Sequence, residues 1–439
     1  MISHILNRRT SIEVNDTEMS WILYITTPGY IFGSLLTLFV CDRYGRRPTL
    51  LLSAVFYFIG MIFSAVANAA WMLCVSQFLW GIGTGIVLIV VTVYLAEIAE
   101  QDIRGRLCVV SSFMTDVGIL FIVGVGALVS YRAFNYWLPL MPVLFFAACY
   151  SIPESPYYLI KKGNIDQARD ALLRLRGDCP TAGSELERMI SEVKEEMQNS
   201  TSFFDLFRRI IYVKAIVIVF GFKLLQHISG MISYQKFYFR ILKESDLVIS
   251  FNTLILIALG VQTVAAILAT LLVDTLGRRR LLIFSFIGAS MSLATAAPYF
   301  YLRSAVPAEQ FLKSCANVPL IAVLLFIFMS FAGLNSVIRL LEVEMFPINV
   351  RIMGIVAVHV FGSIGLPINK LYYTVEDAIG VAGVMGIYAL IALIGAVFTY
   401  FLLPETKGKS LSEIQHALQG KRGKNVQEMT NIEGNLHRF

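Results

Sequence analysis

Long apolar stretches alternate with short charged connections along almost the whole chain. Runs of about 18 or more apolar residues recur, and a helix of that length crosses a hydrocarbon layer roughly 30 Å thick. Stretches of about ten residues with alternating polarity, which mark the strands of membrane barrels, do not occur in the sequence. The pattern predicts an all-α polytopic membrane protein. Its eleven expected spans lie at residues 21–41, 50–69, 71–96, 107–130, 137–152, 213–239, 247–273, 281–302, 318–341, 353–373 and 381–403.

The composition agrees with a chain that is solvated mainly by lipid. Hydrophobic residues make up 57% of the sequence and charged residues 15%, whereas soluble domains carry about 25% charged residues. The sequence shows no nucleophile constellation, metal-ligand spacing or phosphate-binding loop, so we expect no enzyme, no cofactor and no metal site. The glycines of GIGTG at 81–85 fall within a span, where small residues let helices approach each other closely.

Basic residues gather at alternate connections between the spans, most densely from Lys161 to Lys214 and after Lys407. By the positive-inside rule these connections are cytoplasmic, so eleven spans place the C-terminus inside and the N-terminus outside. Asn15 then belongs to an external glycosylation sequon. A second sequon at Asn199 lies in the basic linker and should stay unmodified.

The chain divides into two bundles joined by a polar linker. We expect an extracellular segment at 1–19, a five-helix bundle at 20–152, a cytoplasmic helical linker at 153–212, a six-helix bundle at 213–403 and a cytoplasmic tail at 404–439.

Within the linker, the apolar face between Ala168 and Leu175 predicts a helix that starts at Asn164 or Asp166 and stops at Gly177. A second, charged helix is expected to follow it. The linker holds too few apolar residues for an independent domain core.

Three charged motifs occur twice in the same order, always at a connection on the basic side. CDRYGRR at 41–47 returns as VDTLGRR at 273–279, and PESP at 153–156 returns as PETKG at 404–408. A glutamate seven residues before an arginine also occurs in each half. The repeats predict two parallel halves, an architecture that rocks around a central site.

Arginine forks match carboxylates in bidentate pairs, so these motifs predict a cytoplasmic latch. The alternative is that the arginines only fix the topology and anchor lipid headgroups. The latch residues would be Asp42, Arg46, Arg47, Glu97, Arg104, Glu154, Asp274, Arg278, Arg279, Glu344, Arg351 and Glu405.

Together with Q-x-x-S-G at 226–230, these motifs resemble the sugar porter family of the major facilitator superfamily, and most of all its insect facilitated trehalose and glucose transporters. The resemblance implies the major facilitator fold and sugar transport by alternating access, without hydrolysis and without an organic cofactor. The family has twelve spans, and residues 17–47 resemble its second, so a counterpart of the first is missing. Either the sequence begins too late, or the protein is a truncated relative with weak or no transport.

The resemblance also implies which residues bind the sugar, because uncharged amides and hydroxyls suit sugar hydroxyl groups. Gln226 matches a family glutamine, and His227 stands where the family has a second one. Gln262 takes the position of an amide ligand on the next span. Ser112 and Arg339 align with a family glutamine and tryptophan, so Arg339 would face the sugar.

Asp116 and Lys223 are charged residues within predicted spans. A charge at the bilayer centre costs about 2.5–3.5 kcal/mol on insertion scales, so it usually lines a cavity or finds a partner. In one interpretation Asp116 pairs with Lys223 or Arg339 and adapts the site to an anionic or proton-coupled substrate. In the other, these groups snorkel or belong to a site no longer used for sugar. His227 is likewise either a packing residue or a proton acceptor.

Three functions therefore stay open. The first is facilitative transport of a hexose or a trehalose-like sugar. The second is a sensor or scaffold that binds a solute or a partner without moving it, and the third is transport of another small solute, such as an organic anion. We expect a plasma-membrane monomer whose partners are the solute and the lipid bilayer, with no nucleic acid.

Overall fold

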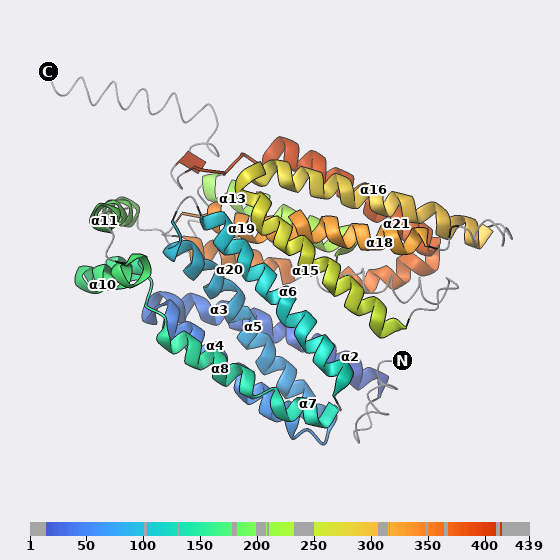
Figure 1. Cartoon of the computed structure of the whole chain (residues 1–439), viewed down its shortest axis with the longest axis horizontal. Coiled ribbons are helices and arrows are strands. Elements are labelled where there is room, and N and C mark those ends of the chain that lie inside the picture. The colour runs from blue at the N-terminus through green and yellow to red at the C-terminus, as the bar shows by residue number, and fades with distance from the viewer. Residues whose placement is uncertain are drawn as a thin grey trace.

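The computed structural model describes residues 15–100, 103–129, 131–177, 182–198, 208, 210–231, 250–305, 315, 317–347, 350–363, 368–409 and 413–414. Its regular elements are helices, as the apolar pattern predicts (Figure 1). Three predicted features lie outside these residues: the external segment up to residue 14, the sequon at Asn199 and most of the tail.

Within the described residues, the first half of the molecule contains seven helices. They are α2 (Asp16–Tyr24), α3 (Thr26–Tyr44), α4 (Arg46–Ala65), α5 (Ala70–Ile98), α6 (Arg104–Leu128), α7 (Tyr131–Trp137) and α8 (Leu140–Ser151).

The second half contains helices that are interrupted more often. They are α13 (Ile210–Gln226), η1 (His227–Met231), α15 (Phe251–Leu276), α16 (Arg278–Ala305), α18 (Val318–Met329), η2 (Ser330–Asn335), α19 (Ser336–Glu344), α20 (Arg351–Ser363) and α21 (Ile368–Leu402). The two η segments are π-helical turns, a distortion that is often found at functional sites.

Ten helices of the described residues are long and apolar enough to cross a membrane. The predicted span at 353–373 begins as the 13-residue helix α20, and α21 breaks at Gly380, where φ is +72°. This break separates the last two predicted spans, so the eleven expected spans are consistent with the ten long helices together with α20. The C-terminal part of the predicted span at 213–239 lies beyond the described residues.

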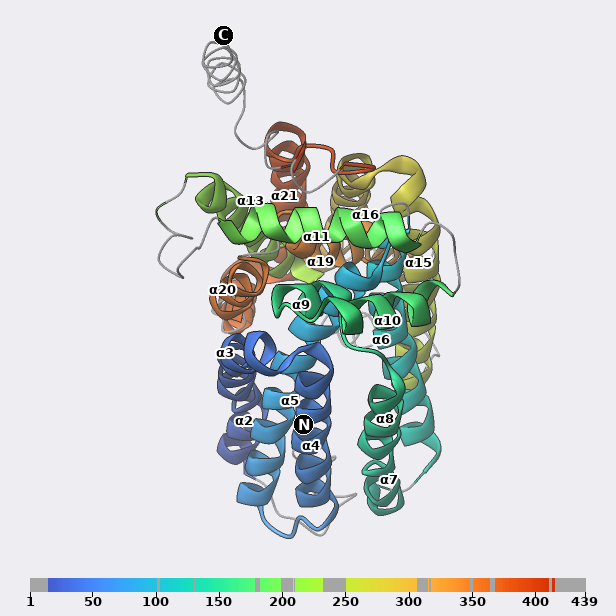
Figure 2. The same ribbon diagram turned by 90° about the vertical axis from the view of Figure 1, so that its left-hand side faces the viewer.

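The two halves lie side by side with their helices running in roughly the same direction (Figures 1 and 2). α6 of the first half packs along α15 of the second, and α3 packs along α20. Within the first half, α3 contacts α5 closely because glycines face the partner backbone. A Cβ at Gly81 or Gly85 would collide with the α3 carbonyls of Thr26 or Tyr30, which confirms the packing interpretation of GIGTG.

Three short helices cross one end of the bundle, which we call the linker end (Figure 2). They are α9 (Pro156–Lys161), α10 (Ile165–Arg176) and α11 (Ala182–Gln198). α10 begins after Asn164 and ends at Gly177, whose φ is +71°, which confirms the predicted helix. A small apolar cluster that includes Leu159, Leu172 and Met189 holds the three helices together.

Candidate functional site

At the linker end of the first half, Arg46 and Glu97 form a buried bidentate ion pair. Arg46 Nε and Nη2 donate to Glu97 Oε2 and Oε1 at 2.8 and 2.7 Å. The Ser155 hydroxyl donates to Glu97 Oε2 at 2.6 Å. Both charged side chains are almost fully buried, so the second donor and the matched fork offset the cost of removing them from water. Together with Glu154, these residues are called the first cluster below.

Glu154 of the first cluster caps the N-terminus of α4. Its Oε1 accepts from the backbone N–H of Arg46 at 3.0 Å, and its Oε2 accepts from that of Arg47 at 3.1 Å. A carboxylate at this place satisfies two helix-end donors and opposes the positive end of the helix dipole. Burial raises the pKa of Glu154, while the backbone N–H groups of Ser155, Arg46 and Arg47 act in the opposite direction.

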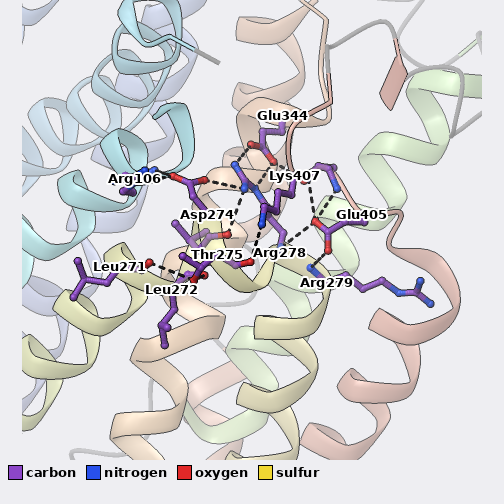
Figure 3. Close-up of polar contacts among 12 residues, drawn as sticks. Arg106, Leu271, Leu272, Asp274, Thr275, Arg278, Arg279, Glu344, Glu405 and Lys407 are labelled. Carbon is purple, nitrogen blue, oxygen red and sulfur yellow. Dashed lines mark hydrogen bonds and ion pairs between the residues drawn. The ribbon is translucent and has the colours of Figure 1, made fainter. Parts of the chain in front are cut away.

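The second half repeats this arrangement atom for atom (Figure 3). Arg278 Nη2 and Nε donate to Glu344 Oε1 and Oε2 at 2.8 and 3.3 Å. Glu405 accepts from the backbone N–H groups of Arg278 and Arg279 at 3.0 and 3.3 Å. The Thr406 hydroxyl donates to Glu344 Oε2 at 2.6 Å, as Ser155 does to Glu97. Arg278, Glu344, Glu405 and Thr406 form the second cluster.

A second arginine follows each cluster and lies over an aromatic ring. The guanidinium carbons of Arg47 and Arg279 lie 5.0 and 5.1 Å from the ring centroids of Tyr150 and Tyr400. Each arginine also donates to the carbonyl of the same tyrosine. The duplication predicted from the sequence therefore extends to contacts that no motif contains.

One residue of the second cluster region reaches across to the first half. Asp274 binds Arg278 Nη1 at 2.9 Å, and its Oδ2 also accepts from the backbone N and Nε of Arg106 at 2.9 and 3.3 Å. Asp42, its counterpart, instead contacts Arg46 and Lys161 of its own half and the linker, at 3.5 and 3.3 Å. Among the described ion pairs of the latch residues, the Asp274 pair is thus the link between halves, and the other pairs close within one half.

Arg104 and Arg351 do not pair with the glutamates seven residues before them. Within the described residues Arg104 forms no hydrogen bond, and its buried Nε has no partner. Arg351 Nε donates to the Phe346 carbonyl at 3.4 Å. Glu97 and Glu344 are occupied instead by the arginines that follow the glycine turns.

Between the halves lie two adjoining cavities of about 390 and 270 Å³. They share residues of both halves, including Tyr30 and Leu88 from the first half and His227 and His359 from the second. The larger cavity also touches both π-helical turns, through His227 and Asn335. Its volume is within the range of small-molecule sites, about 300–1,000 Å³.

The amide groups of the larger cavity come from Gln226 and Asn335. Gln226 Nε2 donates to Asn335 Oδ1 at 3.3 Å and approaches the Met231 sulfur at 3.4 Å. Within the described residues, Gln226 Oε1 and Asn335 Nδ2 form no hydrogen bond and are available to a ligand. His227 lines both cavities, and its Nδ1 is buried without a partner in that part of the structure.

A chain of polar side chains crosses from the second half to the first at this level. Lys223 Nζ donates to Glu342 Oε1 at 2.5 Å, and His359 Nε2 bonds Glu342 Oε2 at 2.7 Å. His359 Nδ1 in turn bonds the Tyr30 hydroxyl of α3. Glu342, whose side chain is 2% exposed, thus has both carboxylate oxygens bonded, one to Lys223 and one to His359.

Within the described residues Asp116 forms an ion pair with neither Lys223 nor Arg339, so the predicted pairing is wrong. Asp116 Oδ1 accepts from Gln262 Nε2 at 2.7 Å, which makes a second polar link between halves, across α6 and α15. Ser112, one turn before Asp116, is fully buried. Neither of the two cavities reaches Ser112 or Gln262. The structure therefore places Gln226, His227 and Arg339 around the larger cavity and Ser112 and Gln262 at the helix interface beside it.

Arg339 lines the larger cavity and is half-buried. Among the described residues it has no hydrogen-bond acceptor and no carboxylate within ion-pair distance. Sequence reasoning found this residue, and it missed Glu342, His359, Tyr30 and Arg106. A glutamate directly after the predicted span at 318–341 and a histidine inside the span at 353–373 are the signals that could have found the first two.

Comparison with known proteins places this architecture in a family. A sequence model described as "Sugar (and other) transporter" matches residues 2–418. The chain belongs to this family. Facilitated trehalose transporter Tret1 of Polypedilum vanderplanki is 27% identical over 415 residues, which are 94% of this chain and 82% of that protein. Sugar transporter ERD6-like 6 of Arabidopsis thaliana is 30% identical over 402 residues, which are 89% of this chain and 80% of that protein.

Solved structures of the xylose transporter XylE share the fold. The proton:xylose symporter XylE bound to 6-bromo-6-deoxy-D-glucose is 19% identical, with a TM-score of 0.76 over 91% of this chain and 89% of that chain. The inward open conformation of XylE from E. coli gives a TM-score of 0.65 at 21% identity, with 91% and 89% covered. The major facilitator fold with two parallel repeats, predicted from the motifs, is confirmed.

Proposed function

We propose that this protein carries a sugar across the membrane by alternating access and without an energy source. The observation that carries the proposal is the polar cavity enclosed between two homologous half bundles, in a chain of the sugar transporter family. The names of the relatives favour a trehalose-like or hexose substrate. The family consists of carriers, and the cavity offers groups that bind a sugar rather than a catalytic constellation.

The predicted site residues Gln226, His227, Gln262 and Ser112 each have a role in this proposal. Gln226 and Asn335 present an acceptor and a donor to sugar hydroxyls, and His227 lies beside them. Gln262 and Ser112 act indirectly, at the interface of α6 and α15. The two clusters keep the linker end of each half rigid, and Asp274 with Arg106 holds this end closed.

We further propose that the linker end faces the cytoplasm of a cell whose plasma membrane holds the protein. The basic residues of the turns and the linker support this orientation. It places Asn15, which is exposed, on the outside as a glycosylation acceptor. It also makes the connection at 153–212 and the tail from residue 404 cytoplasmic.

Proteoliposomes that contain the purified chain test the transport proposal. We expect saturable, labelled sugar counterflow across a panel of hexoses and trehalose. Gln226→Ala should raise KM several-fold, because an acceptor in the cavity is lost. Arg47→Ala should lower the maximal rate, because the linker end of the first half is loosened. Gln77→Ala is the matched control, since Gln77 bonds Thr26 and lines neither cavity. Absence of uptake by correctly inserted protein would contradict the proposal.

A second candidate function is a sensor that binds solute without moving it. The bond between Tyr30 and His359 favours it, because this bond ties the halves together beside the cavity. Sugar binding without counterflow, with counterflow restored by Tyr30→Phe, is the expected result for a sensor. Counterflow by the unaltered chain would exclude this candidate.

A further inference from the structure

We infer that the sugar bound in the larger cavity carries an anionic group and that Arg339 holds that group. The inference rests on the proposed function and adds the chemical class of the substrate, a monosaccharide with a carboxylate. Arg339 lies in the helical stretch Val318–Glu344, which is long and apolar enough to cross a membrane, and it lines the cavity of about 390 Å³. A guanidinium carries five N–H donors and a permanent charge, and within the described residues none of these donors has an acceptor.

The other charges of the cavity wall are already matched. Lys223 is paired with Glu342 at 2.5 Å, and His359 bonds the second oxygen of the same carboxylate at 2.7 Å. The remaining titratable groups on the wall are Tyr30 from α3 and His227 from η1, and neither is an anion at neutral pH. Among the described residues of the wall, Arg339 is therefore the cation that has no matching carboxylate.

Asp116 does not supply the missing partner. It lies on α6 outside both cavities, its Oδ1 accepts from Gln262 at 2.7 Å, and it forms no ion pair with Arg339 within the described residues. The charge of Arg339 acts on Asp116 only at longer range. A ligand carboxylate can reach Arg339 from the cavity side and accept two parallel hydrogen bonds, the geometry that this side chain favours.

The same wall also offers groups for the hydroxyls of a sugar. Asn335 lies one helical turn before Arg339, so the two side chains project from the same face. Asn335 Nδ2 and Gln226 Oε1 are unused within the described residues, since their bond to each other employs the opposite atoms. A ligand whose carboxylate binds Arg339 and whose hydroxyls bind the amides of Gln226 and Asn335 is a sugar acid. A neutral hexose would satisfy the amides and leave the charge unmatched.

The test compares three probes of nearly equal shape on the purified full chain. D-glucuronate carries the carboxylate, D-glucuronamide replaces it by a neutral amide, and D-glucose has a hydroxymethyl group there. We expect D-glucuronate to bind at least about tenfold more tightly than the two neutral probes in calorimetric titration. In Arg339→Gln the three probes should bind alike, because the discriminating charge is gone. Arg339→Lys should keep part of the preference, since the charge remains without the fork.

The matched control is Arg303→Gln, which removes an exposed arginine at the end of α16, remote from the cavity lining. It should keep the preference for D-glucuronate. Equal binding of D-glucuronate and D-glucuronamide by the unaltered chain would overturn the inference, and this comparison involves no variant that could misfold. Uptake of D-glucose without a preference for D-glucuronate overturns the inference and leaves the proposed function intact. If the chain neither binds nor takes up any probe or panel sugar, the inference and the proposed function are both contradicted.

Discussion

The carboxylate of Glu342 has both oxygens engaged by cationic or polar partners in the interior of a membrane helix bundle. Lys223 takes one oxygen and His359 the other. Removing one member of such a pair leaves a buried charge without compensation, whereas removing both members together costs little. The contribution of the Lys223–Glu342 ion pair can therefore be measured by comparing the stability of a single variant with that of the double variant.

Glu342→Gln should destabilise the protein by about 3–5 kcal/mol, because the Lys223 ammonium then lacks its anion. Thermal unfolding of the detergent-solubilised protein measures this as a fall in apparent Tm. The double variant Lys223→Met, Glu342→Gln should recover most of the loss. A double variant as unstable as the single one would show that the ion pair is not the cause.

The sequence located only part of this site, for a physical reason. Gln226 and His227 were predicted because a motif places them, and Arg339 because it replaces a family residue. Glu342 and His359 were not predicted, because helical periodicity shows that residues share a face but not which helix lies opposite. The pairing of Lys223 depends on how α13, α19 and α20 pack, and no local pattern contains that information.

At the scale of the element, each glycine turn is completed by a carboxylate from a distant segment. Gly277 has a φ of +87°, and Glu405 caps the helix that starts after it. The first half does the same with Gly45 and Glu154. The turn, the cap and the ion pair therefore form one unit, in which a side chain at the glycine position would disturb the cap.

Gly277→Ala should lower the apparent Tm for two reasons. The backbone at Gly277, with φ +87° and ψ +161°, lies in a region that costs a residue with a Cβ about 1–3 kcal/mol, and the Cβ would lie 2.6 Å from Glu405 Oε2. Gly260→Ala is the control within α15, because a Cβ there meets nothing within 4 Å. Its Tm should stay the same or rise slightly, since alanine favours helix. Equal losses in both variants would contradict the role assigned to the turn.

The helices themselves were well predicted, because apolar length alone decides which segments cross a membrane. The π-helical turns at His227–Met231 and Ser330–Asn335 were not predicted. A π-turn changes the hydrogen bonding of the backbone without changing the apolar pattern, so the apolar pattern does not predict it. Both turns contribute residues to the larger cavity, so the unpredicted part of the fold is also the part that shapes the site.

At the scale of the whole molecule, the polar links between the halves in the described residues include Asp274 with Arg106, Tyr30 with His359 and Asp116 with Gln262. Asp274 with Arg106 lies at the linker end, and Tyr30 with His359 lies beside the cavities. Rocking of the halves must break the first of these before the linker end can open. The ion pair of Arg106 is exposed and weak, so most of the effect should come from the backbone N–H bond to the carboxylate.

Asp274→Ala should therefore favour the state that is open at the linker end. Cys108 on α6 is only 3% exposed, and it can report opening in a variant without the other cysteines. We expect its maleimide labelling rate to rise about tenfold, the effect of a hydrogen bond to a charged group. Asp42→Ala is the matched control, since Asp42 contacts Arg46 and Lys161 but not the second half. Equal acceleration in both variants would show that Asp274 does not act as the link.

The self-contained first cluster has a consequence for how the chain is made. Its members, from Arg46 to Ser155, are all present once residue 155 has left the ribosome. The first half can form its buried ion pair while the second half is still being translated, in keeping with domain-by-domain folding. Because Arg46 and Arg278 each find their glutamate within their own half, neither of these two arginines depends on the other half for its partner during insertion.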